Sequence, residues 1–186
     1  MLATGCPTAS YLSYRVAPNY PKTDEAEALT LVGLEAPVEV WFDELGVPHV
    51  DARSDLDLVR AVGFLQARER FFEMDLLRRV ARGRVSELVG EQEMLGGSTL
   101  TWDVAMRGWG FEEAVEQDLR AADADTLALV QAYVSGANQA LALGAPIEYR
   151  LLGLEPEPWR AADSLVIGRL QAWSVTHNWH QELSRL

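Results

Sequence analysis

A regular spacing of apolar residues over positions 54 to 90 constrains the fold of this 186-residue chain more than any other feature. Apolar side chains recur there every three or four residues, which is the period of one helix face. They are Leu58, Val62, Leu65, Phe72, Leu76 and Val80. Ser54 and Asp57 resemble a capping pair at the start, while Gly83 interrupts the pattern and Gly90 suits a stop. The sequence predicts a long amphipathic helix.

Two short apolar runs ahead of this helix predict a β-hairpin. Residues 38–42 alternate like a strand, and residues 47–50 form a second one at a position where an edge tolerates proline. Residues 43–46, which end on a glycine, are expected to form the turn. Upstream, residues 1–35 hold prolines without periodicity and are expected to be an irregular arm, which leaves residues 36–186 as the folded domain.

Two more helices are predicted in the second half of the chain. Asp125 is expected to cap the first, which ends at Gly144, and Asp163 to cap the second, which runs toward Leu186. Residues 91–110, with four glycines, are expected to form an extended connection. The prediction is an α+β chain, mostly helical. Its long irregular joins favour a part of a larger body over a self-sufficient domain.

The charge balance excludes two classes of partner. The formal net charge is −12, with 28 acidic residues against 16 basic ones, so the chain repels nucleic acids and anionic lipids. The basic residues concentrate in one stretch: Arg68, Arg70, Arg78, Arg79, Arg82 and Arg84, interleaved with Glu69, Glu73, Asp75 and Glu87. That mixture is typical of a helix crossed by salt bridges and not of a nucleic acid patch.

The single cysteine, Cys6, rules out a disulfide within the chain. No run of 18 apolar residues occurs, so the sequence predicts no transmembrane segment. Residues 2–6 resemble the end of a bacterial lipoprotein signal, in which Cys6 would carry the lipid anchor of an exported protein. A free thiol in the arm is the alternative.

No complete active site is visible in the residues themselves. His177 and His180, with Glu182 nearby, suggest zinc ligands, but they are three residues apart and lack the His-Glu-x-x-His context, so packing roles are favoured. None of the serines lies in a Gly-x-Ser-x-Gly motif or beside a lysine. No phosphate loop or dinucleotide fingerprint is present, so no organic cofactor is expected.

Several segments keep a common order and spacing over about four fifths of the chain. They are VWFDELGVPHV at 40–50, AVGFLQARERFFEMD at 61–75, RR at 78–79, GRVSELVG at 83–90, YVSGAN at 133–138, PIEY at 146–149, and PW at 158–159 followed by Asp163. Together they resemble the amino-terminal signature of the penicillin acylase family.

This resemblance implies that the chain is the small (alpha) subunit of an N-terminal-nucleophile hydrolase. Family members are made as precursors that cut themselves into a small and a large (beta) chain. The large chain begins with the catalytic serine, whose free α-amino group acts as the base. The implied fold is an αββα sandwich that the mostly helical small chain completes. No catalytic residue is therefore expected in this chain.

The resemblance also implies functional positions on the final helix. Aligned on Trp159 and Asp163, this helix matches the family helix that lines the acyl pocket and then binds calcium. The substrate-binding positions are Ala172, Val175 and Thr176. Here they lack the methionine, arginine and phenylalanine of penicillin G acylases, so a roomier apolar pocket is expected. Glu182 falls at the position of a ligand to a structural Ca²⁺ shared with the large chain.

The implied substrate is a small N-acylated molecule, such as a β-lactam with an amide side chain. Removal of the fatty acyl group from homoserine lactones is an alternative within the same enzyme class. A lipid-tethered adaptor without enzymatic activity is an alternative from another class. The expected location is the periplasm or the membrane surface of a bacterium.

Overall fold

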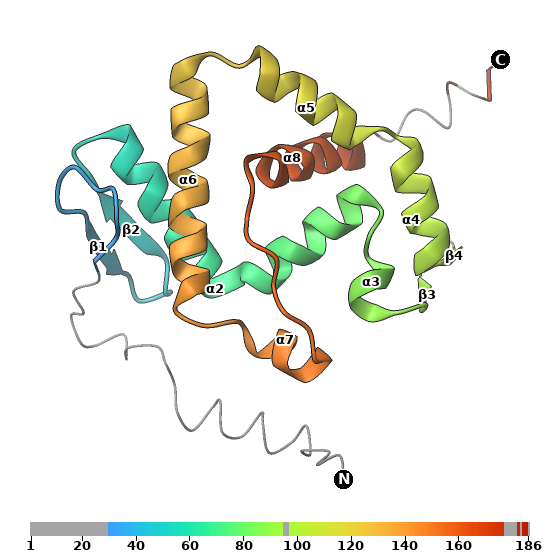
Figure 1. The fold of residues 1–186 in the computed structure, drawn as a ribbon, viewed down its shortest axis with the longest axis horizontal. Helices are drawn as coiled ribbons and strands as arrows, with labels where there is room; N and C mark the ends of the chain where they lie inside the picture. The colour runs from blue at the N-terminus through green and yellow to red at the C-terminus, as the bar shows by residue number, and fades with distance from the viewer. Residues whose placement is uncertain (1–29, 95–96, 177–181, 183, 186) are drawn as a thin grey trace, which may run out of the picture. The chain divides into compact units, whose positions relative to one another are not determined.

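The computed structural model describes residues 30–94, 97–176, 182 and 184–185, and shows a mostly helical chain with two small hairpins (Figure 1). The chain divides into two compact units. The first comprises the described residues up to Phe72 together with Ala128–Trp159, and the second comprises Glu73–Leu127 and the described residues from Arg160 on. Cys6 and the predicted arm, apart from residues 30–35, lie outside the described residues.

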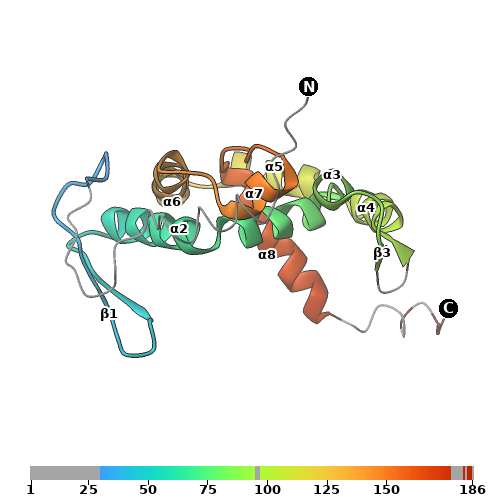
Figure 2. The ribbon, with the colours of Figure 1, turned by 90° about the horizontal axis from the view of Figure 1, so that it is seen from below.

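The predicted hairpin opens the first unit. Strands β1 (Glu39–Phe42) and β2 (Pro48–Asp51) are antiparallel, with Trp41 opposite His49. The turn closes through the Gly46 amide, which donates to the Asp43 carbonyl at 2.9 Å, and Gly46 has the positive φ of 75° that favours glycine. The hairpin projects away from the helices of its unit (Figure 2). Its sequence prediction is confirmed.

The long predicted helix is α2 (Asp55–Arg82), whose first part, up to Phe72, belongs to the first unit. The Ser54 hydroxyl accepts from the Asp57 amide at 3.2 Å, which confirms the predicted cap. Arg70 has non-helical angles (φ −138°, ψ 21°) that interrupt the helix. The helix ends before Gly83, whose φ of 63° lies in the left-handed region. A separate turn, α3 (Ser86–Val89), continues to Gly90.

Asp57 fastens the segment that precedes the hairpin. Its fully buried carboxylate accepts the backbone amides of Glu35 at 3.0 Å and Ala36 at 3.1 Å. The Glu35 amide, and after it the Ala36 amide and Ser54, hold the pKa of Asp57 below its ordinary 3.8 although burial acts in the opposite direction. A lowered pKa means that the ionised carboxylate stabilises the folded state above about pH 4, and that this contribution disappears as the pH falls through the lowered value.

Asp57→Asn is therefore expected to lower the melting temperature at neutral pH by several degrees. The gap to the wild type should narrow progressively below about pH 4 and be smallest once the pH has fallen below the lowered pKa of Asp57, where the folded wild-type carboxyl is protonated as well. Thermal unfolding followed by circular dichroism at both pH values measures this. Asp55→Asn, an exposed carboxylate in the same turn, is the control. A gap that is equal at both pH values would contradict the role of the charge.

Helix α6 (Ala124–Ala142) runs from the second unit into the first, where it crosses α2 at very short range. A Cβ built on Gly136 would lie 1.9 Å from the Arg60 carbonyl oxygen, and one on Gly63 would lie 2.3 Å from that of Tyr133. Glycine at both positions lets the two backbones touch. The cap of α6 is Asp123, which accepts the Thr126 amide at 2.7 Å, so the predicted cap at Asp125 is wrong by two residues.

The first unit also contains a cluster of aromatic side chains from α2, α7 and the segment before α8. Tyr149 of the short helix α7 (Ile147–Leu152) is fully buried, with its ring 6.3 Å from Phe71 and 5.5 Å from Phe72. Trp159 meets the other side of Phe71 edge-on at 6.0 Å. The Asn138 side chain exchanges two hydrogen bonds with the Trp159 backbone, at 2.7 and 2.9 Å. The family-like segments at 71–72, 138, 149 and 159 therefore meet in one place.

The second unit contains the end of α2 with α4 (Thr99–Gly108), α5 (Phe111–Ala121) and α8 (Ala161–Val175). A short hairpin of β3 (Glu93–Met94) and β4 (Gly97–Ser98) precedes α4. The apolar core consists of Ala81, Met106, Val115, Val166 and Leu170. Across the described residues, no helix is both long and apolar enough to cross a membrane.

The expected extended connection over 91–110 is wrong, because α4 occupies half of it. The Ser98 hydroxyl accepts from the Thr101 amide at 3.3 Å and caps this helix, and its last residue is Gly108. Of the glycines that suggested a loop, the three that the structure describes, Gly97, Gly108 and Gly110, lie at the ends of regular elements. Gly110 occupies the left-handed region at the start of α5 with a φ of 67°.

Candidate functional site

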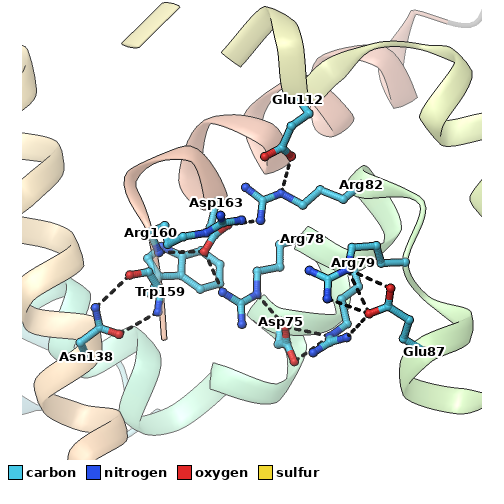
Figure 3. A network of polar contacts seen from close by, with 11 residues as sticks. Asp75, Arg78, Arg79, Arg82, Glu87, Glu112, Asn138, Trp159, Arg160 and Asp163 are labelled. Atoms are coloured by element: carbon cyan, nitrogen blue, oxygen red, sulfur yellow. Dashed lines mark hydrogen bonds and ion pairs between the residues drawn. The ribbon is translucent and has the colours of Figure 1, made fainter. Parts of the chain in front are cut away.

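The first turn of α8 is held by one buried carboxylate, that of Asp163. It accepts the Arg160 amide at 2.7 Å and thereby closes a capping box, so Asp163 is the third residue of the helix and not its first cap. Arg78 and Arg82 reach the same carboxylate from α2, at 2.7 and 2.8 Å (Figure 3). Asp163 is completely buried. The beginning of α8 is thus fixed to the end of α2.

The arginines of α2 extend this contact into a network. Asp75, also fully buried, accepts from Arg78 Nε at 2.6 Å and from Arg79 Nε at 3.1 Å. Burial acts to lower the pKa of Arg78, but the carboxylates of Asp75 and Asp163 outweigh it and raise that pKa above its usual value. Every proton of the buried guanidinium is therefore retained at physiological pH.

Partly exposed acids complete the network at its two ends. Glu87 binds Arg79 at 3.2 Å and Arg84 at 2.7 Å, and Glu112 at the start of α5 binds Arg82 at 2.6 Å (Figure 3). The prediction of a helix crossed by salt bridges is confirmed. What sequence spacing does not indicate is that these charges are buried and reach across to other helices.

The three predicted pocket residues lie together at the other end of α8. Ala172, Val175 and Thr176 are spaced by three and four residues, so they share one helix face, and all three are exposed. Val175 is 76% exposed. The Thr176 hydroxyl donates to the carbonyls of Ala172 at 3.2 Å and Trp173 at 3.0 Å, which ends the helix. This face presents methyl groups to whatever lies against it.

Trp173 lies behind this face and packs against the core of the second unit. Its ring is 5.7 Å from that of Trp109, which is 44% exposed. Helix α4 carries two further exposed apolar side chains on one face, Leu100 at 53% and Val104 at 64%. The second unit therefore shows apolar surface on both α4 and α8.

Glu182 is exposed, and its carboxylate lies 3.6 Å from Arg185. Within the part of the chain that the structure describes, no three His, Cys, Asp or Glu side chains come close enough together to hold a metal ion. His177 and His180 lie outside the described residues. Because Ca²⁺ takes six to eight oxygen ligands, Glu182 fits only as one ligand of a shell completed elsewhere.

One buried acid, Asp103 on α4, was not singled out from the sequence. Its carboxylate accepts the amides of Val85 at 2.8 Å and Ser86 at 3.0 Å, and the Ser86 hydroxyl also binds it. It thereby caps α3. Its spacing from Thr99 and Met106, both buried on the same face of α4, is the signal that could have identified it.

Comparison with known proteins gives a consistent result. The family model described as penicillin amidase matches residues 37–186. Penicillin acylase 2 proenzyme of Pseudomonas sp. (strain SE83) is 42% identical over 144 residues, which are 76% of this chain and 18% of that protein. Acyl-homoserine lactone acylase QuiP of Pseudomonas aeruginosa is 28% identical over 185 residues, 98% of this chain and 21% of that protein.

A solved structure resembles this fold as well. Thermostable penicillin G acylase from Alcaligenes faecalis superposes with a TM-score of 0.64 at 27% identity, covering 78% of this chain and 75% of that chain. The two proteins found by sequence are much longer, and this chain spans about a fifth of the length of each.

Proposed function

The chain belongs to the penicillin amidase family, and from this membership we propose that it is the alpha subunit of a two-chain amide hydrolase. The match over residues 37–186 carries the proposal. The enzyme would cleave the amide of a small N-acylated substrate through an acyl-enzyme on the amino-terminal serine of a larger beta chain. The two chains would come from one precursor and together form the αββα sandwich.

The distribution of exposed apolar residues supports the proposal that a second chain covers part of this surface. Strand β1 exposes Val40, Trp41 and Phe42, and the turn exposes Leu45 at 88%. An isolated two-stranded hairpin is marginal in water, whereas one added to a larger sheet gains backbone hydrogen bonds. The exposed faces of α4 and α8 likewise suit an interface. We assign these surfaces to contact with the beta chain.

In this proposal the chain contributes to catalysis by shaping the acyl-binding pocket. Ala172, Val175 and Thr176 would form one wall, and the Asp163 network would fix the helix that carries them. The nucleophile, its base and the oxyanion donors would all come from the beta chain. A free amino-terminal serine supplies both a hydroxyl nucleophile and a nearby amine base.

Purification of the chain from its native source, with mass and amino-terminal sequencing of what accompanies it, tests the proposal. A copurifying chain several times larger that begins with Ser, Cys or Thr would support the self-processed hydrolase and identify its nucleophile. A folded chain that purifies alone would instead support the lipid-tethered adaptor.

Homoserine lactones are a second substrate candidate, because the acyl-homoserine lactone acylase QuiP matches over 98% of this chain. The small side chains at the three pocket positions suit a long aliphatic acyl group as well as an aromatic one. Initial rates with a series of acyl chains would separate the two. Preference for medium or long aliphatic chains favours the lactone, and preference for arylacetyl groups favours the β-lactam.

Thr176→Phe is expected to shorten the range of acyl groups accepted, with at least a tenfold loss of kcat/KM for the longest chains, because a phenyl ring fills the pocket. Ala172→Phe should act in the same way. Initial rates with short and long acyl substrates measure the change. The matched control is Ser174→Phe, which places the same ring on an exposed position at the opposite side of the helix. An unchanged acyl profile in both Thr176 and Ala172 variants would remove this helix from the pocket.

We also propose that Glu182 supplies one oxygen ligand to a structural Ca²⁺ shared with the beta chain. Glu182→Ala is then expected to reduce the gain in melting temperature that calcium confers on the two-chain enzyme. Melting curves with calcium and with a chelator measure this, and Glu148→Ala, an acid in the first turn of α7, serves as the control. Equal calcium stabilisation of wild type and Glu182→Ala would count against the ligand.

Location follows from the same proposal. An exported, periplasmic enzyme is expected, either free or tethered through lipid on Cys6, which lies outside the described residues.

A further inference from the structure

Residues 32–36 lie just ahead of the hairpin β1–β2 and are attached to the helices of the first unit in a way that does not depend on the proposed enzymatic function. In the described part of the chain, the hydrogen bonds that hold them are made by their backbone, to the side chains of Asp57, Arg60 and Gln139. We propose that these three side chains form a binding site for an extended peptide backbone, in which residues 32–36 are held as a strap that attaches and opens as one unit.

Gln139 of α6 pairs with the backbone of Val32 in both directions. The Val32 amide donates to Gln139 Oε1 at 2.6 Å, and Gln139 Nε2 donates to the Val32 carbonyl at 3.1 Å. Nε2 also donates to the hydroxyl of Ser135, one helical turn earlier, at 3.1 Å, which fixes the orientation of the side chain. A side-chain amide carries one acceptor and an amino donor, so it reproduces the two-way pairing that a neighbouring β-strand would offer.

Asp57 and Arg60 of α2 bind the peptide groups that follow. The fully buried Asp57 carboxylate accepts the amides of Glu35 at 3.0 Å and Ala36 at 3.1 Å, and Arg60 Nη1 donates to the Gly33 carbonyl. Arg60 Nη1 also lies 3.5 Å from the Asp57 carboxylate, so the two side chains hold each other in place. The site thus offers acceptors to N–H groups and donors to carbonyls within a few residues, which is what an extended backbone requires.

The side chains of the strap contribute little to this contact at two of its positions. Val32 is 75% exposed, and Glu35 is exposed as well. Gly33 differs, because its φ of 90° lies in the left-handed region and a Cβ there would lie 3.2 Å from the Arg60 guanidinium. The site therefore binds peptide groups at Val32 and Glu35, and it requires a particular residue at Gly33.

The anchors are expected to act together. The net gain from one hydrogen bond is no larger than the entropy cost of ordering the backbone of one residue. No single anchor can therefore hold the strap by itself, and the loss of one should release the residues that the others bind.

Hydrogen exchange of the purified protein, read at single amides, tests this cooperation. Gln139→Ala removes both contacts with Val32 and leaves Asp57 in place. It is expected to lower the protection factors of the Glu35 and Ala36 amides together with that of Val32, each roughly tenfold, because the three amides share one opening event. Amides inside α6 should keep their protection. A loss confined to the Val32 amide, or no loss at any of the three, would overturn the proposal.

Asn138→Ala is the matched control, since Asn138 precedes Gln139 on α6 and exchanges the same two kinds of hydrogen bond with the backbone of Trp159. This variant should lower the protection of the Trp159 amide and leave the strap amides unchanged. Val32→Ala should also leave the strap protected, whereas Gly33→Ala should expose it. Strap amides that respond to Asn138→Ala or Val32→Ala as strongly as to Gln139→Ala would show that no such backbone site exists.

Discussion

Replacement of Asp163 by alanine is expected to cost about 3–5 kcal/mol of folding stability, because it leaves buried guanidinium groups without their shared anion. Asp163 is completely buried; it accepts hydrogen bonds from Arg78 and from the Arg160 amide, both at 2.7 Å, and forms an ion pair with Arg82 at 2.8 Å. The remaining acids compensate only in part, since Asp75 is shared between Arg78 and Arg79, and Glu112, which stays on Arg82 at 2.6 Å, is 44% exposed. Urea unfolding of the wild type and the variant measures the loss.

Asp118→Ala is the matched control for that experiment. Asp118 also pairs with an arginine of the second unit, Arg169 at 2.5 Å, but both side chains are about two fifths exposed. Water screens such a pair, so its loss should cost about 0–1 kcal/mol. Asp163→Asn should lie between the two, since it keeps the shape and one acceptor. If Asp163→Ala and Asp118→Ala cost the same, burial of the network does not govern stability.

Gly136→Ala is expected to destabilise the first unit by about 1–3 kcal/mol or more, although alanine is the better helix former. The added methyl group would lie 1.9 Å from the Arg60 carbonyl oxygen and 2.9 Å from the Phe64 nitrogen. Both obstacles are backbone atoms, so the two helices would have to separate to admit it. Urea unfolding again provides the measurement.

Gly168→Ala isolates the packing effect from helix propensity. Gly168 lies within α8 on an exposed face, and a Cβ built there meets nothing within 4 Å. The substitution should therefore stabilise by about 0.4–1 kcal/mol, opposite in sign to Gly136→Ala. If both substitutions had the same sign, close contact between α2 and α6 would not be the deciding factor. Gly63→Ala, which meets the Tyr133 carbonyl oxygen at 2.3 Å, should behave like Gly136→Ala.

Regular elements with strong local signals could be predicted from the sequence. The hairpin follows from alternation and Gly46, and α2, α6 and α8 follow from helical spacing. Helix α4 could not be predicted in the same way, because Gly96, Gly97, Gly108 and Gly110 around it suggested a loop. Glycine marks the ends of a helix as readily as it marks a loop, and Ser98, which caps α4 in the structure, is the local signal that distinguishes the two.

The buried face of α2 is a second place where the sequence pattern misleads. The large apolar residues at 58, 62, 65, 72, 76 and 80 are half-buried or exposed, whereas Ala61, Phe64, Ala67 and Phe71 lie in the core. Small residues are buried because α6 approaches so closely. Asp75 and Arg78 continue the buried line as charged groups, and apolar periodicity has no means of detecting them.

The candidate site also contains residues that could be predicted and residues that could not. Resemblance to a family selected Ala172, Val175 and Thr176. Their spacing puts them on one face of α8, and the structure shows that this face is exposed. Their role remains a prediction. The residues that fix this helix, Asp163 with Arg78 and Arg82, were visible in the sequence only as charges, because their pairing depends on how α8 lies against α2.

The distance along the chain between Arg78 and Asp163 has a consequence for synthesis in the cell. The partners are 85 residues apart, whereas Asp75 is within one helical turn of Arg78. At a ribosomal rate of 5–20 residues per second, Arg78 and Arg82 wait about 4–17 seconds before their second acid is made. Until then, burial of the Arg78 and Arg82 guanidinium groups would leave them without Asp163. We therefore expect the second unit to close only after α8 has been made. A ribosome stalled before Asp163 would therefore hold an open chain that proteases and chaperones can still reach.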